Sequence, residues 1–190
     1  MKPVLILIAA SSCCDFETPA RAAGASVCER QMSQAAKRHG VPLAVLYAVG
    51  LAETGRRGAL QPFAVNIEGT SYFASNLAGA LHLVDEALKR GARLIDAGCM
   101  QINHYFHASH FHSVEAMFDP HQNVDYAARF LKELRIREGN WTLAAARYHA
   151  GPNNDPAQKR YVCLVIANMV ASGFGDWTAN ARDFCGRMPP

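Results

Sequence analysis

The sequence lacks a strong excess of charge of either sign. Charged residues make up only 18% of the 190 residues and the formal net charge is +3, whereas half of the residues are hydrophobic. A charge this weak and scattered does not indicate a nucleic acid as partner, although it favours an acidic polymer over a basic one. The hydrophobic content argues against a disordered chain. Because no internal repeat or low-complexity tract is present, this length fits one compact domain.

A long hydrophobic segment is also missing. The early apolar run PVLILIAA, preceded by one lysine, is too short to anchor the chain across a bilayer. The PARAAG that follows places Ala20 and Ala22 at a small-x-small cleavage site. Residues 1–22 are therefore predicted to be a secretory signal peptide, and residues 23–190 a single mature domain without a transmembrane span. The alternative is a lipid anchor at Cys13, but ASSC is a poor lipobox because Ala stands at the usual Leu position.

Cysteine is sparse, and no CxxC or Cys/His pair has zinc-binding spacing, so no structural metal is predicted. Removal of the signal peptide would leave four cysteines: Cys28, Cys99, Cys163 and Cys185. In an exported chain these predict two disulfides, with three connectivities left open. A bridge between Cys28 and Cys185 would close most of the mature chain into one loop.

Hydrophobic periodicity and capping residues predict a mainly α fold with a small β-hairpin excursion. The clearest start is Asp119-Pro120, an N-cap followed by proline at the first helical position, and Gly139 ends this helix. The segment PFAVNIEGTSYFA breaks the helical pattern and predicts a hairpin that turns around Glu68-Gly69. The remaining helices are expected over residues 28–39, 42–54, 75–90, 141–150 and 159–173.

One carboxylate stands out because it ends an apolar run. In LYAVGLAETG, Glu53 is the first charge after Pro42, and it falls in the last turn of the predicted helix, before Gly55. The negative end of the helix dipole and apolar neighbours both disfavour an ionised side chain there. The protonated form suits a general acid that must hold its proton near neutral pH. The structural alternative is a solvent-exposed Glu53 that pairs with Arg56 or Arg57.

Two further segments carry polar groups beside glycine turns. DAGCMQIN contributes Gln101 and Asn103, whose amides both donate and accept hydrogen bonds and therefore suit sugar hydroxyls and N-acetyl groups. ARYHAGP contributes Tyr148 near a helix end, where a tyrosine hydroxyl can hold a carboxylic acid in place. Each segment taken alone is more often structural than functional.

Three motifs follow one another along the chain: a Glu that closes an apolar helix, then Gly-x-Met-Gln-Ile-Asn, then Ala-x-Tyr-x-Ala-Gly-Pro. In this order they resemble the SLT-type lytic transglycosylases, which cleave peptidoglycan. The resemblance covers about residues 28–172 and implies the lysozyme-like helical fold that this family shares with goose-type lysozyme. It implies that Glu53 is the catalytic acid/base and that Met100 and Gln101 line the glycan. It also implies that Tyr148 contacts the catalytic acid, and that the protein works in the periplasm without a cofactor.

Three positions depart from the family pattern. Thr54 stands where the family usually has Ser after the Glu, and it keeps the hydroxyl. Cys99 replaces the Leu of Gly-Leu-Met-Gln, which brings a thiol or a disulfide near the cleft. His149 replaces the Asn that usually follows the motif tyrosine, which puts the role of that amide in doubt and adds a titratable group. We keep Thr54, Asn103 and His149 as candidate substrate-binding residues.

The reaction that the resemblance implies is substrate-assisted and leaves a 1,6-anhydro-MurNAc end. It does not need a second carboxylate. Asp96 would be the candidate for one, but the sequence favours a structural role for it, as an N-cap or in a loop hydrogen bond. Glu68 is expected at the hairpin turn or in contact with sugar at the rim. A domain this small also resembles the specialised members that open local gaps for secretion systems or flagella.

Other interpretations stay open. A hydrolytic lysozyme would use water as the nucleophile, and a glycan-binding or assembly module would use the same fold without catalysis. Five of the eight histidines lie between His104 and His121, which suggests a transition-metal site. Their spacing is irregular and no Asp or Glu falls within residues 104–112, so a sugar-facing or solvated loop is the preferred interpretation.

Overall fold

The computed structural model describes residues 25–56, 58–151 and 155–186. The predicted signal peptide and the alternative anchor at Cys13 lie outside these residues. The chain is mainly helical with one small sheet, as expected, and the arrangement is lysozyme-like. Within the described part of the chain, none of the helices has the length and apolar character that crossing a membrane would require.

The chain begins with two helices that meet through apolar faces. α1 (Val27–His39) starts at a Ser26 capping box and ends at Gly40 in the left-handed conformation. α2 (Leu43–Thr54) follows after Pro42, which is the N-cap rather than the first helical residue. Gly55 ends α2, as the sequence predicts. Most of α2 is buried in the core, which explains why its sequence is apolar nearly all round.

The sheet is larger than the sequence predicts. The hairpin forms from β1 (Ala64–Ile67) and β2 (Thr70–Phe73), with the turn at Glu68 and Gly69. Two short strands extend it, β3 (Ile95–Ala97) and β4 (Ile102–Asn103), in the antiparallel order β2-β1-β3-β4. The DAGCMQIN segment is therefore a second tight hairpin. Between the two hairpins runs α3 (Leu77–Lys89).

The longest part of this region is α6 (Pro120–Glu138), which contributes a buried stripe to the core. α4 (His104–His107), a 3₁₀ turn (Ala108–His110) and α5 (Val114–Phe118) lead into α6. Asp119 caps α6 and Gly139 ends it, and the predicted stripe of Val124, Ala127, Ala128 and Leu131 is fully buried. α7 (Trp141–Ala150), α8 (Asp155–Ala171) and α9 (Ala179–Cys185) complete the chain.

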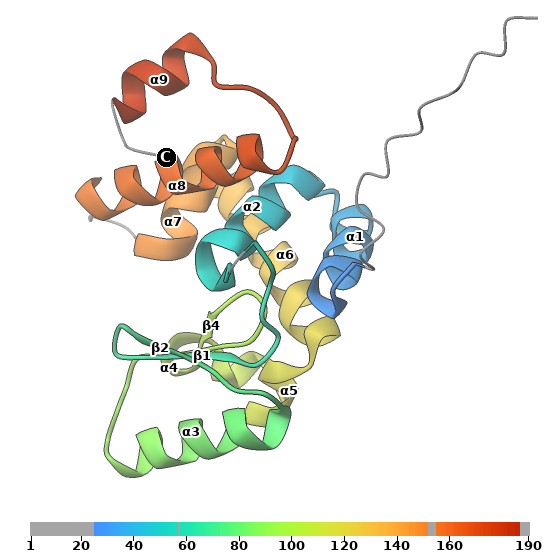
Figure 1. Ribbon diagram of the computed structural model, residues 1–190, viewed down its shortest axis with the longest axis vertical. Coiled ribbons are helices and arrows are strands. Elements are labelled where there is room, and N and C mark those ends of the chain that lie inside the picture. Colours follow the sequence, from blue (N-terminus) through green and yellow to red (C-terminus); the bar gives the residue numbers. More distant parts are fainter. Residues whose placement is uncertain (1–24, 57, 152–154, 187–190) are drawn as a thin grey trace, which may run out of the picture.

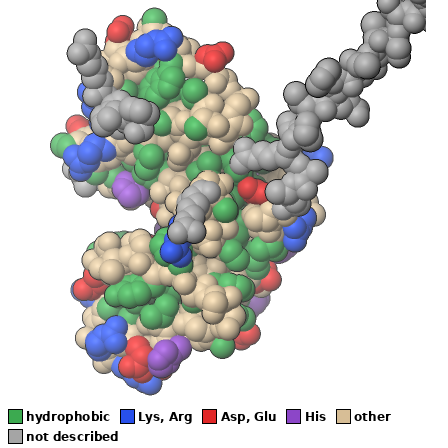
Figure 2. Space-filling model, viewed as in Figure 1, with side chains coloured by type: hydrophobic (Ala, Val, Ile, Leu, Met, Phe, Trp, Pro, Cys, Tyr) green, Lys and Arg blue, Asp and Glu red, His purple; other side chains and the backbone are tan. Residues whose placement is uncertain are grey.

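Two parts of the molecule face each other across the end of α2. α7, α8 and α9 lie on one side and the sheet with α3 on the other, and α2 ends between them (Figure 1). The surface is hollowed between these two parts (Figure 2). α1 packs on α6, while α8 packs on both α2 and α7.

Two disulfides form, as predicted, and the structure settles their pairing. Cys28 of α1 pairs with Cys99 of the β3–β4 turn, and Cys163 of α8 pairs with Cys185 of α9. The long-range bridge between Cys28 and Cys185 does not form. One disulfide thus fixes the DAGCMQIN hairpin to the N-terminal helix, and the other fixes the last helix to its neighbour.

Candidate active site

Glu53 lies in the last turn of α2, and its side chain is only 13% exposed. Tyr161 of α8 donates its hydroxyl hydrogen to Glu53 Oε1 at 2.6 Å. The expected structural alternative, a solvent-facing Glu53 paired with arginine, does not fit this environment. Arg56 instead lies over the Phe73 ring, 4.9 Å from its centroid, and Arg57 lies outside the described residues.

His149 reaches the same carboxylate oxygen from α7. Its Nδ1 lies 3.8 Å from Glu53 Oε1, and its ring stacks flat on Tyr161 with centroids 4.3 Å apart. The neighbouring Glu53 carboxylate raises the pKa of His149. Within the described part of the chain, no donor contacts Oε2 of Glu53. Both approaching groups therefore orient the carboxyl through Oε1.

The β3–β4 turn below Glu53 is held by a buried amide. Asn123 of α6 accepts a hydrogen bond from the Met100 N–H at 2.9 Å. Its Nδ2 donates to the carbonyls of Ala97 and Met117. Gly98 makes this close approach feasible, because its φ is +79° and an added Cβ would lie 2.6 Å from Asn123 Nδ2. The glycine of the motif is thus required by packing against α6.

Three residues expected at the substrate have mainly structural contacts. Thr54 is buried, and its hydroxyl contacts the carbonyls of Gly50 and Cys99, so it links α2 to the β3–β4 turn. The Met100 side chain is also buried in the core. Gln101, with a φ of +45°, donates from Nε2 to the carbonyls of Ala64 and Gly98. This geometry supports roles in shaping the cleft, and of the three residues only Gln101 is half-buried rather than buried.

The tyrosine that holds Glu53 is a different one from the tyrosine of the motif. Tyr148 donates its hydroxyl hydrogen to the Met100 carbonyl at 2.7 Å, while the hydrogen bond to Glu53 comes from Tyr161. The contact between Tyr148 and the catalytic acid therefore stays a prediction, and the hydrogen bond that the structure shows to Glu53 comes from Tyr161. Burial, followed by the Glu53 charge, raises the pKa of both tyrosines well above the usual value, which keeps both hydroxyls as donors.

Asp96 and Asn103 lie on the sheet side of the site. Asn103 Nδ2 donates to Asp96 Oδ1 at 2.7 Å, and Asn103 Oδ1 accepts from the Phe106 N–H at the start of α4. Burial raises the pKa of Asp96 to about 6, the Asn103 hydrogen bond opposes this, and the Glu53 charge adds to it. The predicted N-cap role of Asp96 is wrong, since Asp96 is the middle residue of β3. The predicted loop hydrogen bond is instead a bond between paired residues of β3 and β4.

The remaining candidate residues lie elsewhere. Glu68 sits at the hairpin turn, as predicted, and accepts a hydrogen bond from the Arg93 N–H. In the histidine cluster, His107 contacts the Tyr126 hydroxyl through Nδ1 at 2.7 Å. Within the described ranges, no three His, Cys, Asp or Glu side chains gather in a way that would hold a metal ion.

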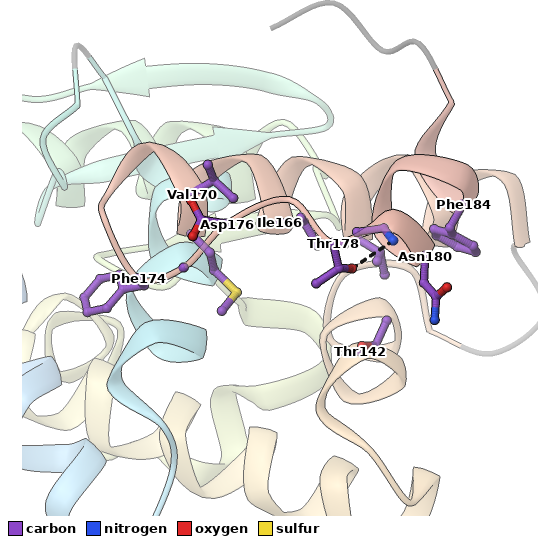
Figure 3. Close-up of a pocket in the computed structure, with 12 residues that line it drawn as sticks. Thr142, Ile166, Val170, Phe174, Asp176, Thr178, Asn180 and Phe184 are labelled. Atoms are coloured by element: carbon purple, nitrogen blue, oxygen red, sulfur yellow. Dashed lines mark hydrogen bonds between the residues drawn. The ribbon is translucent and has the colours of Figure 1, made fainter.

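An apolar cavity among the described residues is separate from Glu53. It has a volume of about 480 Å³ and is lined by residues of α7, α8, α9 and the α8–α9 connection, among them Ile166, Val170 and Phe174 (Figure 3). Asp176 is the one charged side chain in its lining, which is otherwise mostly apolar. This cavity has none of the paired polar groups that surround Glu53.

The structure thus brings the Glu53 carboxyl together with a tyrosine donor and an imidazole at the end of α2. Comparison with known families matches residues 30–163 to the family described as Transglycosylase SLT domain. Because this match covers most of the chain, the protein belongs to that family, whose members are lytic transglycosylases acting on peptidoglycan. No significant match was found among curated proteins or among solved structures.

Proposed function

We propose that the protein cleaves the β-1,4 bond between MurNAc and GlcNAc with Glu53 as the acid/base, and leaves a 1,6-anhydro-MurNAc end. Glu53 donates the proton on Oε2 to the glycosidic oxygen, and the C1–O bond breaks with its electron pair on that oxygen. The C6 hydroxyl oxygen then attacks C1, and its proton returns to Glu53. The sugar N-acetyl group and the local charges stabilise the positive C1 in between.

The observation that carries the proposal is the environment of the Glu53 carboxyl. Tyr161 and His149 both approach Oε1, so among the described residues the other oxygen is left without a protein donor. Gln101 and Asn103 lie on the sheet side, where their amides suit the sugar hydroxyl and N-acetyl groups. Thr54, Met100 and Tyr148 shape this wall from behind.

The test is a digest of purified peptidoglycan, with the released muropeptides weighed by mass spectrometry. We expect 1,6-anhydro products from the wild type, and a loss of at least about 10³-fold in rate for Glu53→Gln, because the amide cannot donate an acidic proton. Full activity of Glu53→Gln would remove Glu53 from the mechanism. An inactive wild type would instead favour a glycan-binding or assembly module.

A hydrolytic lysozyme is the second candidate, and Asp96 is the observation that favours it. A second carboxyl close to Glu53 is the arrangement that glycosidases use with water as the final nucleophile. The same digest separates the two functions, since the anhydro product is lighter by one water than the reducing end from hydrolysis.

We also propose that the mature protein, residues 23–190, is exported to the periplasm after loss of the signal peptide. We further propose that it opens the wall locally for a secretion or flagellar apparatus, a role that its membership of the SLT family supports. Intact mass measurement of the protein recovered from the periplasm checks the first point. A mass that starts at residue 23 is expected, whereas an acylated Cys13 would contradict it.

A further inference from the structure

A row of polar side chains crosses all four strands of the sheet. The strand register pairs Ser71 with Asn66, Asn66 with Asp96, and Asp96 with Asn103. Directly paired residues point to the same face of a sheet, so these four side chains lie side by side. Hydrogen bonds join the outer pairs, from Asn66 Nδ2 to Ser71 Oγ and from Asn103 Nδ2 to Asp96 Oδ1.

The opposite face of β3 is apolar and buried. Ile95 and Ala97, the neighbours of Asp96 on the strand, are in the core, whereas Asp96 itself is only partly buried. The alternation of the strand therefore turns the Asp96 carboxyl away from the core. On that side it comes within electrostatic range of Glu53 and His149, which reach the cleft from α2 and α7.

We propose that Asp96 is a second catalytic carboxylate, which faces the reacting sugar from the sheet side and stabilises the positive charge that develops at C1. The proposal rests on the proposed function, because it assumes that Glu53 protonates the glycosidic oxygen from the helical side. As the C1–O bond breaks, its electron pair leaves with that oxygen, and C1 shares a positive charge with the ring oxygen. A negative group held opposite the acid lowers the energy of this state.

The surroundings of Asp96 fit this role better than a purely structural one. Asn103 is its one hydrogen-bond donor among the described residues, and it contacts only Oδ1. A carboxylate kept for structure would be paired with an arginine or lysine or fully hydrogen-bonded, and the described residues supply no such cation to Asp96. The groups that face it are Glu53, His149 and Tyr148, all of which line the site.

The experiment measures kcat and KM on soluble, uncrosslinked peptidoglycan strands for Asp96→Asn, which keeps an acceptor for Asn103. We expect kcat to fall by on the order of 10²-fold with KM changed less than about threefold, since the carboxylate acts on the transition state. The matched control is Asp85→Asn, a carboxyl on the exposed face of α3 that pairs with Lys89. It should retain wild-type kcat.

The pH profile supplies a readout that a structural role would not move. Wild-type kcat should fall as Asp96 is protonated below about pH 6, and this acidic limb should be lost in Asp96→Asn. Asn103→Ala removes the hydrogen bond that favours the ionised carboxyl, so its acidic limb should move to higher pH.

Parallel assays of Glu53→Gln keep the two proposals apart. In one outcome Glu53→Gln is inactive, but the kcat of Asp96→Asn stays within threefold of the wild type. That result overturns the role of Asp96 and leaves the proposed function standing. Loss of kcat in both variants, with reducing ends as the product, supports Asp96 while it overturns the anhydro outcome. Full activity of both variants overturns both proposals.

Discussion

Replacing Asp96 by asparagine should make the protein more stable at neutral pH. In the folded protein, burial raises the pKa of Asp96 from an ordinary value of 3.8 to about 6. Each pKa unit corresponds to about 1.36 kcal/mol, so ionisation of Asp96 at pH 7 costs the folded state about 3 kcal/mol relative to the unfolded chain. Asparagine carries no charge and still offers an oxygen to Asn103, so the variant avoids this cost.

The sign of the pH dependence follows from the direction of the shift. Below about pH 4 the carboxyl is protonated in both states, and the wild type and Asp96→Asn should have similar free energies of unfolding. Between about pH 4 and 6 the unfolded chain loses its proton first, so the wild type loses stability relative to the variant. Above about pH 6 the difference should stay constant at its maximum.

Urea unfolding followed by far-ultraviolet circular dichroism, at steps from pH 4 to 8 with both disulfides intact, measures this difference. Asp85→Asn is the control, and its stability relative to the wild type should not grow between pH 4 and 6. The reasoning is refuted if Asp96→Asn is equally or less stable than the wild type at pH 7.5. A stabilising variant that is also inactive would show that the carboxylate is retained for the reaction and not for the fold.

Three further predictions concern the groups around the cleft. Tyr161→Phe removes the donor to Glu53 Oε1, so kcat should fall by about tenfold or more with KM nearly unchanged; unchanged kcat would contradict the positioning role. Glu53 raises the pKa of His149 in the folded protein. Protonated His149 therefore stabilises the fold fully at pH values below its pKa in the unfolded chain, and this stabilisation is lost as the pH rises through its pKa in the folded protein. His149→Asn should therefore lower the melting temperature more at pH 5.5 than at pH 8.5, and an equal loss at both would refute this. Gly98→Ala should destabilise by more than about 2 kcal/mol because its Cβ would meet a buried amide, while Gly69→Ala, with open space at the turn, should cost much less in the same urea experiment.

Helices with strong local signals could be predicted from the sequence. Asp119-Pro120 and Gly139 bound α6 in the structure as they do in the pattern, because capping depends on adjacent residues. β3 and β4 were missed, since strands of three and two residues are too short to show alternation. β3 pairs with β1, which is distant in the sequence, and β4 pairs only with β3.

The residues of the candidate site also differ in whether a local sequence signal predicts them. Glu53 could be predicted, because its position at the end of an apolar helix is local and the motifs follow it in a fixed order. Tyr161 could not, since it lies 108 residues further along the chain, and a tyrosine in an apolar helix looks like core packing. The closeness of Asp96 to Glu53 depends on strand register, which the sequence does not state.

The pairing of Cys28 with Cys99 encloses the helix end and the sheet side of the cleft in a covalent ring. The ring spans a sequence separation of 71 residues and contains both Glu53 and Asp96. Closing a loop of this length in the unfolded chain is worth about 4 kcal/mol in the chain-entropy picture, which is comparable with the net stability of many small domains. We therefore expect that a newly made, reduced chain brings Glu53 and Asp96 together poorly. Formation of the Cys28–Cys99 disulfide would then be the step that activates the enzyme.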